Sequence, residues 1–256
     1  MKLTLDLHVH SDASFDGRMS VRQIALLAKA RGIDGVAICD HDVVYTGPTE
    51  VEGVLIIPGA EFSTEYGHLL GLFLTAPIQH TTWKETVQAI HDQGGITVLA
   101  HPYQNKRSGS LEPFRPILDD IDAVETWNSR ANRKYPRAND NAFILALLRN
   151  KLSTGGSDAH VPQEVGRGFL TVDVEERTLA AVKAQILGGY KPEGGRYWGH
   201  GRPSSARYVA SSQRTKLRKA HAGAGAYAKW GLFSLNCLRQ DAARTLRELK
   251  QKLPAR

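Results

Sequence analysis

Two histidines separated by one residue, His8 and His10, begin the part of this sequence that is suited to chemistry. They end an apolar, alternating stretch at residues 3–9, which predicts a β-strand. Side chains at positions i and i+2 of a strand share a face, so both imidazoles can point to one place. Two ligands on a rigid strand end suit one metal ion. For this pair alone, two surface histidines on an edge strand are the alternative.

Further histidines and carboxylates follow at the ends of later apolar stretches, and Asp158 with His160 repeats the same spacing. The metal-ligand candidates are His8, His10, Asp16, His41, Glu61, His68, His101, Asp158 and His160. Nine nitrogen and oxygen donors suit three divalent cations with about three protein ligands each. Neutral imidazoles with only three carboxylates leave such a cluster net positive, which favours binding of a phosphate. The ions would also lower the pKa of a bound water toward ~7, so the set predicts phosphoester hydrolysis.

Short apolar stretches alternate with helical patterns and must position these side chains. The sequence predicts strands at 35–39, 54–60, 67–74, 96–100, 121–127 and 153–156, and helices at 19–30, 83–93, 111–118, 138–149 and 176–187. This alternation predicts an α/β fold with a mostly parallel sheet. Most of the candidate ligands come at the C-terminal ends of the strands, where α/β barrels and open α/β sheets place active sites, whereas His68 lies near the start of its strand.

The candidates occur, in order, inside short motifs that resemble one family over about residues 1–170. The motifs are His8-Val9-His10-Ser11, Asp40-His41-Asp42, Gly59-Ala60-Glu61, His68, His101-Pro102 and Gly156-Ser157-Asp158-Ala159-His160. Together they resemble the PHP (polymerase and histidinol phosphatase) family. The resemblance implies a distorted (β/α)7 barrel with a trinuclear metal site and phosphoester hydrolysis. The compact size and the VETWN segment at 124–128 look most like the stand-alone phosphoesterase branch.

The resemblance also implies how the nine residues divide among three divalent ions. The division is His8, His10, Glu61 and Asp158 for the first ion, bridging Glu61 with His68 and His101 for the second, and Asp16, His41 and His160 for the third. Zn, Mn and Fe all suit such ligands, so the sequence leaves the metal open. The expected catalytic residues, which handle the proton, are Asp158, His160 or His41.

Basic residues after the expected strands are candidates for substrate binding. Arg130 with Asn128 is predicted to hold a substrate phosphate, since a guanidinium binds phosphate through paired hydrogen bonds. Arg167 is a further candidate, and solvated loop charge is the alternative. The predicted substrate is a nucleotide, an oligonucleotide or a small phosphomonoester such as histidinol phosphate.

Other residues near the candidates are assigned supporting roles. Asp12, Asp40 and Asp42 are expected to orient an imidazole or to cap loops, and Glu125 to support the mouth of the site. Cys39 stands where the family usually has threonine and is interpreted as a small buried residue. The alternative for Cys39 is a thiolate near the metals, which would favour softer ions.

Charge divides the 256 residues into two parts. The net charge of +7 splits into −5 over residues 1–195 and +12 over 196–256. We therefore expect a PHP-like phosphoesterase domain at 1–195 and a basic, mostly helical C-terminal extension at 196–256. Nucleic acid contact through this tail, around residues 214–219, is a functional prediction. A packed helix with solvated charge is the alternative, and the oligomeric state is left open.

Composition narrows the location of the protein. No apolar run reaches the ~18 residues needed to span a membrane, and the N-terminus has no signal-peptide pattern. Two cysteines make no disulfide framework. These features predict a cytoplasmic protein without membrane contact.

Two rival functions are consistent with parts of the sequence. Amidohydrolase-type C–N hydrolases also use a His-x-His pair at a barrel strand, but they often bridge two metals with a modified lysine. No lysine in this sequence comes at such a strand end. The other rival is a non-catalytic, metal-stabilised module whose basic tail binds nucleic acid, against which stand the nine intact candidates.

Overall fold

The structure is a computed structural model and describes residues 1–79, 82–104, 112–135 and 137–188. The predicted basic extension at 196–256 and the domain boundary at 195 lie outside these residues. No helix within the described ranges is long and apolar enough to cross a membrane.

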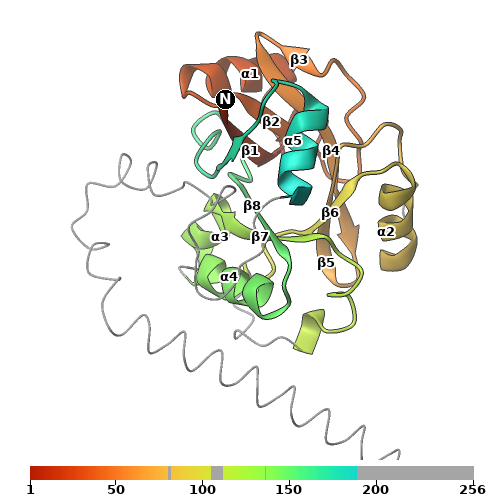
Figure 1. The fold of residues 1–256 in the computed structure, drawn as a ribbon. Helices are drawn as coiled ribbons and strands as arrows, with labels where there is room; N and C mark the ends of the chain where they lie inside the picture. Colours follow the sequence, from red (N-terminus) through yellow and green to blue (C-terminus); the bar gives the residue numbers. More distant parts are fainter. Residues whose placement is uncertain (80–81, 105–111, 136, 189–256) are drawn as a thin grey trace, which may run out of the picture.

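A single curved β-sheet forms the centre of the fold. The strands are β1 (Lys2–Val9), β2 (Gly35–Ile38), β3 (Glu50–Val51), β4 (Val54–Thr64), β5 (Gly67–Leu72), β6 (Ile96–Leu99), β7 (Ala123–Asn128), β8 (Leu152–Gly156) and β9 (Leu170–Asp173). They are ordered β8-β7-β6-β5-β4-β2-β1-β9, with β3 paired to β4. Beyond β8 the chain meets β1 again, because the amide of Asp158 donates to the carbonyl of His8 at 2.8 Å. The sheet is therefore nearly closed into a barrel (Figure 1).

The sheet is mixed, whereas the sequence predicted a mostly parallel one. The β1–β2, β2–β4, β6–β7 and β7–β8 pairs are parallel, but β4–β5, β5–β6 and β1–β9 are antiparallel. Glu65 and Tyr66 alone separate β4 from β5. So short a turn permits only an antiparallel hairpin, since a parallel pair needs a long crossover. The α/β barrel is confirmed, and the mostly parallel sheet is wrong.

The helices of the described residues are α1 (Val21–Ala30), α2 (Trp83–Asp92), α3 (Ser129–Lys134), α4 (Ala138–Leu148) and α5 (Leu179–Gly188). Four of them, α1 to α4, lie on the outside of the sheet, whereas α5 packs side chains into the barrel interior (Figure 1). Ser20 caps α1 in a reciprocal capping box with Gln23, which fixes the start of this helix. Within the described part of the helix predicted at 111–118, a single 3-10 turn forms at Glu112–Phe114. Pro113 and Pro116 explain this, since proline interrupts helical hydrogen bonding.

Alternate side chains of the strands face two apolar layers. Ala37 of β2 and Cys39, which directly follows this strand, pack into the barrel interior. They lie there with residues from the other strands except β3 and with Val182 and Ile186 of α5. Val36 and Ile38 face the other way and pack against α1. A third cluster joins α2 and α4 to the outer faces of β4 to β7. The barrel is thus filled by side chains from within and supported by helices from without.

A β-bulge near the end of β1 decides where the two histidines of this strand point. Asp6 pairs with Val36 and Val9 pairs with Ile38, so three steps along β1 match two along β2. Leu7 belongs to the barrel interior, whereas Val9 packs against α1. Strict alternation from Leu7 would place Val9 inside, and the extra residue reverses this. His8 consequently turns toward the open end of the barrel.

Candidate metal centre

The structure brings all nine predicted ligand residues together at one end of the barrel. Eight of them lie near or after the carboxyl end of a strand, whereas His68 lies at the start of the antiparallel strand β5. The nine residues form four overlapping groups whose donor atoms lie within 4.8 Å of one another. The groups are His10, Asp16, His41 and His160; His8, Glu61 and His101; His8, His10 and Asp158; and His41, Glu61 and His68. Residues from six separate segments of the chain therefore converge on one place.

Glu61 of β4 lies at the centre of this cluster. Its Oε1 is 2.7 Å from Nδ1 of His68 and 2.8 Å from Nε2 of His101. Its Oε2 is 3.4 Å from Nε2 of His8 and 3.3 Å from Nε2 of His10. The same Oε2 is 3.4 Å from Nδ1 of His41, so one oxygen of Glu61 faces two imidazoles and the other faces three.

The two β1 histidines converge as a pair of ligands would. Their Nε2 atoms are 3.1 Å apart. The Nδ1 of His8 lies 3.0 Å from a carboxylate oxygen of Glu125, which accepts a hydrogen bond from it. In the neutral ring Nδ1 then carries the hydrogen, and Nε2 presents its lone pair to the cluster. Two nitrogen ligands of one tetrahedral ion, each bound at 2.0–2.1 Å, are ~3.3 Å apart. The spacing of the two Nε2 atoms fits a shared cation.

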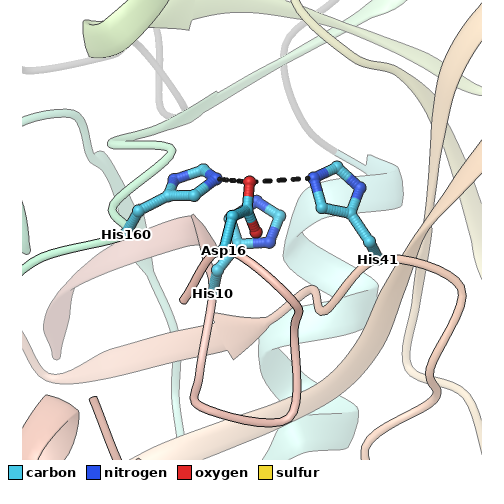
Figure 2. Close-up of side chains that lie close together, drawn as sticks. All are labelled: His10, Asp16, His41 and His160. Atoms are coloured by element: carbon cyan, nitrogen blue, oxygen red, sulfur yellow. Dashed lines mark ion pairs between the residues drawn. The ribbon is translucent and has the colours of Figure 1, made fainter. Parts of the chain in front are cut away.

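Asp16 links a third group of side chains, seen in Figure 2 between His160 and His41 with His10 behind it. Its Oδ2 lies 2.8 Å from Nε2 of His160 and 3.6 Å from Nε2 of His41. Ser14 donates to the other carboxylate oxygen at 2.9 Å and holds the loop acid in this position. The Nδ1 of His41 is buried, lies 3.4 Å from Oε2 of Glu61 and has no partner in hydrogen-bond geometry among the described residues. A buried nitrogen facing a carboxylate in this way fits a site that binds a cation.

Asp158 completes the cluster from the loop after β8. Its Oδ1 is 3.5 Å from Nε2 of His10 and 3.9 Å from that of His8. Asp158 has φ 56° and His101 has φ 24°, which is the left-handed region that non-glycine residues rarely adopt. Strained backbone of this kind gathers at functional sites, where the surrounding structure maintains it.

Glu125 of β7 lies beneath the cluster and joins three segments. One oxygen contacts His8, while the other accepts from the amide of His101 at 2.9 Å and from the side chain of Asn128 at 3.0 Å. The predicted supporting role of Glu125 matches these contacts. The sequence showed only an acid in a strand and could not show which histidine it would orient.

The polar atoms of Asn128, a predicted phosphate contact, bind groups of the protein itself. The residue is 0% exposed. Its amide group donates to Glu125 and to Asp158, the latter at 3.3 Å, and its Oδ1 accepts from the amide of Ala131 as the cap of α3. The structure thus uses Asn128 to support the cluster, where the sequence suggested substrate binding.

The two arginine candidates both contact Glu164, Arg130 through its side chain and Arg167 through its backbone. The side chain of Arg130 is 27% exposed, and its Nη1 is 3.3 Å from Oε2 of Glu164. The same oxygen accepts from the amide of His160, so Arg130 lies beside the cluster. Arg167 is partly buried, and its backbone amide donates to the carbonyl of Glu164. Arg130 is therefore the better placed of the two to contact a substrate.

Two of the nearby aspartates have loop-capping contacts, as predicted. Asp40 accepts from the amide and the hydroxyl of Ser11, both at 2.6 Å. Asp42 accepts from the amide of Ser63 at 2.8 Å. Asp40 thereby fixes the loop that carries Asp16.

Asp6 is a buried carboxylate that the sequence did not single out. It accepts from the amides of Ser157 and Gly166, each at 2.8 Å, and so holds the loop after β8 against β1. Burial raises the pKa of Asp6 to about 6, although these hydrogen bonds lower it. Its position in the alternating β1 pattern gave no sign that a later loop would cover it.

Cys39 is a small buried residue, as interpreted from the sequence. Its Sγ lies 3.6 Å from the carbonyl oxygen of Leu7, and burial raises the pKa of the thiol far above its ordinary value. Cys39 belongs to none of the groups of candidate metal donors among the described residues, so the structure favours the small buried residue over a thiolate near the metals.

The charges in the cluster are strongly coupled. Burial would raise the pKa of Glu61, but the charge of His8 and hydrogen bonds from neighbouring imidazoles hold it well below its usual range. Burial would lower the pKa of His10, but hydrogen bonds to Asp158 and Glu61 raise it to about 9. In the absence of an ion, protons on the imidazoles therefore compensate the buried carboxylates. Divalent cations would replace these protons, because metal binding requires deprotonated ligands.

The fold and the site define an α/β barrel with a candidate polynuclear metal centre at one end of the barrel. The PHP domain model matches residues 6–100, and the PHP-associated model matches residues 136–189. The chain belongs to the PHP family, as its motifs indicated.

Individual relatives agree with this assignment. An uncharacterized protein of Methanocaldococcus jannaschii is 33% identical over 176 residues, which cover 66% of this chain and 70% of that protein. A protein of Acetivibrio thermocellus named a probable phosphatase is 26% identical over 204 residues, covering 65% of this chain and 83% of the relative.

A solved structure from Bacteroides vulgatus is similar in fold. It is a two-domain protein described as containing a predicted PHP-like metal-dependent phosphoesterase. The TM-score is 0.58 at 19% identity, over 73% of this chain and 63% of that one. The chain thus spans less than two thirds of that protein, and at this identity the likeness shows the fold alone.

Proposed function

We propose that this protein is a metal-dependent phosphoesterase. The observation that carries the proposal is the position of Glu61, whose two oxygens face separate sets of imidazoles. A bridging carboxylate between two cations has this arrangement. Two cations held about 3.5–4 Å apart suit the in-line displacement of a phosphoester. The Acetivibrio relative, which is named a probable phosphatase, supports the same chemistry.

The proposed ligand sets are those that the resemblance to the family implies. Groups of donor atoms in the structure support the first and third sets, whereas His68 and His101 each lie in a different group with Glu61. His8, His10, Glu61 and Asp158 would hold the first ion, Glu61 with His68 and His101 the second, and Asp16, His41 and His160 the third. His10 also lies in the third group of the structure, so its imidazole is close to both sites. When bound, divalent ions of the Zn, Mn or Fe type would supply Lewis acidity and lower the pKa of a coordinated water.

The chain's own residues position the substrate and handle its protons in this proposal. Nδ1 of His160 lies 3.0 Å from the carbonyl oxygen of Asp158, so Nδ1 carries the proton and Nε2 faces Asp16. His41, with its buried Nδ1, lies on the other side of Asp16. Asp158, His160 and His41 are the proposed residues for proton transfer.

Arg130 is the proposed contact for the substrate phosphate. Its partial exposure and its position beside His160 allow the guanidinium to approach an anion at the cluster. Arg167 is a secondary proposal because it lies on the same loop as Glu164. Neither residue depends on the ions for its charge, since arginine remains protonated at all ordinary pH values.

A panel of phosphoesters tests the proposal. The purified chain, loaded in turn with Mn, Zn and Fe, is assayed on nucleoside monophosphates, short oligonucleotides and alkyl phosphomonoesters. We expect turnover of at least one class, with most of it lost in His10→Ala and kept in His91→Ala. His91 is a matched control because it pairs with Asp122 and lies outside the cluster. Unchanged turnover in His10→Ala would contradict the metal mechanism.

The rival functions give different results in the same assay. Hydrolysis of amides without hydrolysis of phosphoesters would support a C–N hydrolase. Nucleic acid binding without any hydrolysis would support the non-catalytic module. Nucleic acid contact through residues 196–256 is a separate proposal, and it is tested by comparing binding before and after removal of this segment.

A further inference from the structure

Phe15 is a large apolar side chain that lies in the open beside the candidate metal centre. It is 82% exposed, the highest value among the large hydrophobic residues that the structure describes as exposed. Its ring stacks on the imidazole of His41, with centroids 5.0 Å apart and an interplanar angle of 22°. Since one face covers His41, the other face is open to solvent.

The backbone on both sides of Phe15 is fixed. The amide of Ser14 donates to the carbonyl of Ser11, and the amide of Gly17 donates to the carbonyl of Ser14, each at 3.2 Å. A Cβ at Gly17 would lie 1.7 Å from the carbonyl oxygen of Ser11, so this tight loop requires glycine. The side chain of Ser14 also holds Asp16. The ring is thus displayed from a closed loop and not from a loose one.

A second exposed apolar residue lies next to the same imidazole along the chain. Val43 is 44% exposed and follows His41 by two positions. Apolar side chains exposed next to a functional site mark a contact with a ligand more often than isolated ones do. Phe15 directly precedes Asp16, a proposed metal ligand. The organic part of a substrate whose phosphate binds at the cluster would therefore extend over Phe15 and Val43.

We propose that Phe15 is a specificity-determining residue that stacks on a planar ring of the substrate, and that the substrate is a nucleoside phosphate. The proposal rests on the proposed phosphoesterase function. A nucleobase has a flat face of the size of the Phe15 ring and lies only a sugar away from the phosphate. Base stacking on an aromatic side chain tolerates any base, so this contact selects nucleotides without selecting one base.

Matched substrates isolate the stacking contact. Adenosine monophosphates and ribose 5-phosphate share the phosphoester and the sugar, and differ by the base. We expect Phe15→Ala to lower the ratio of kcat/KM for the nucleotide to that for the sugar phosphate by about 5- to 100-fold. Phe15→Trp should keep the ratio within about threefold, since tryptophan also stacks. Leu26→Ala, an exposed apolar residue on α1, is the control and should leave the ratio unchanged.

Calorimetric binding of the same ligands separates this inference from the proposed function. If no phosphoester is hydrolysed, the function fails, while the ratio of binding affinities in wild type and Phe15→Ala still decides the role of Phe15. A wild-type protein that does not prefer the nucleotide would overturn the inference. An equal loss for both ligands in Phe15→Ala would also overturn it, because the ring would then only support His41. A changed oligomeric state with an unchanged ratio would assign the ring to a contact between copies of the chain.

Discussion

Nδ1 of His8 lies 3.0 Å from Oε1 of Glu125, and this contact joins the end of β1 to β7 beneath the candidate metal centre. The same carboxylate accepts from the amide of His101. It therefore orients an imidazole in one proposed metal group and the backbone of a residue in another. Carboxylates that hold the remote nitrogen of a ligating histidine fix both its tautomer and its ring orientation.

Glu125→Ala should weaken metal binding by about 10- to 100-fold, the usual effect of removing such a partner. Glu125→Gln should weaken metal binding less, because the amide oxygen of glutamine can still accept a hydrogen bond from His8. Some loss should remain, since the NH2 group of glutamine and the backbone amide of His101 are both donors. Competition against a chelator of known affinity measures the change. Glu176→Gln, at an exposed acid, is the control. Equal affinity in wild type and Glu125→Ala would show that His8 is oriented by other contacts.

Arg130→Ala should lower kcat/KM for a phosphoester by about 10- to 100-fold, as expected for the loss of one charged hydrogen bond. Arg130→Lys should recover only part of this, because an ammonium cannot form the paired contact of a guanidinium. Steady-state kinetics gives the values. Arg177→Ala is a matched control, since Arg177 pairs with Glu50 instead. A loss no larger than in the control would remove Arg130 from the substrate site.

Chelation should lower the thermal stability of the metal-loaded protein. An ion present at 100 times its dissociation constant stabilises the fold by about 2.7 kcal/mol, which for a chain of this size is about 5–10 °C in Tm. Thermal unfolding with and without a chelator measures the difference. His8→Ala should show a smaller chelator effect, while His91→Ala should behave as wild type. A Tm that does not respond to chelation would contradict a buried metal centre.

Most of the ligand candidates were predictable because several strands end in, or are followed by, a histidine or an acidic residue. His8 and His10, and Asp158 and His160, carried the spacing, and the structure brings all nine candidates together. The bulge in β1 was not predictable, since it depends on the register with β2 and not on the β1 sequence. The contacts of Asn128 were not predictable either, since they depend on which residues pack around it. Its amide group donates to Glu125 and Asp158, and its Oδ1 caps α3.

Long-range packing also limited the prediction of the fold. Leu170–Asp173 forms β9 by pairing with β1, which lies more than 160 positions earlier, and four residues alone give no clear strand pattern. Val182 and Ile186 of α5 enter the barrel interior, a contact that helical periodicity cannot assign to one partner. The sequence therefore showed which residues belong to the site more clearly than which strands run antiparallel.

Asp16→Asn should remove one ion and leave the others bound. Asp16 contacts His160 and His41 through its Oδ2, whereas the pair of oxygens on Glu61 serves the other two proposed sites. The metal content per chain after dialysis, measured by elemental analysis, should fall by about one equivalent from about three. Asp12→Asn changes an exposed acid of the same loop and should have no effect. Equal loss of all ions in Asp16→Asn would contradict a separate third site, and His10, which borders two groups, would then be the residue that couples them.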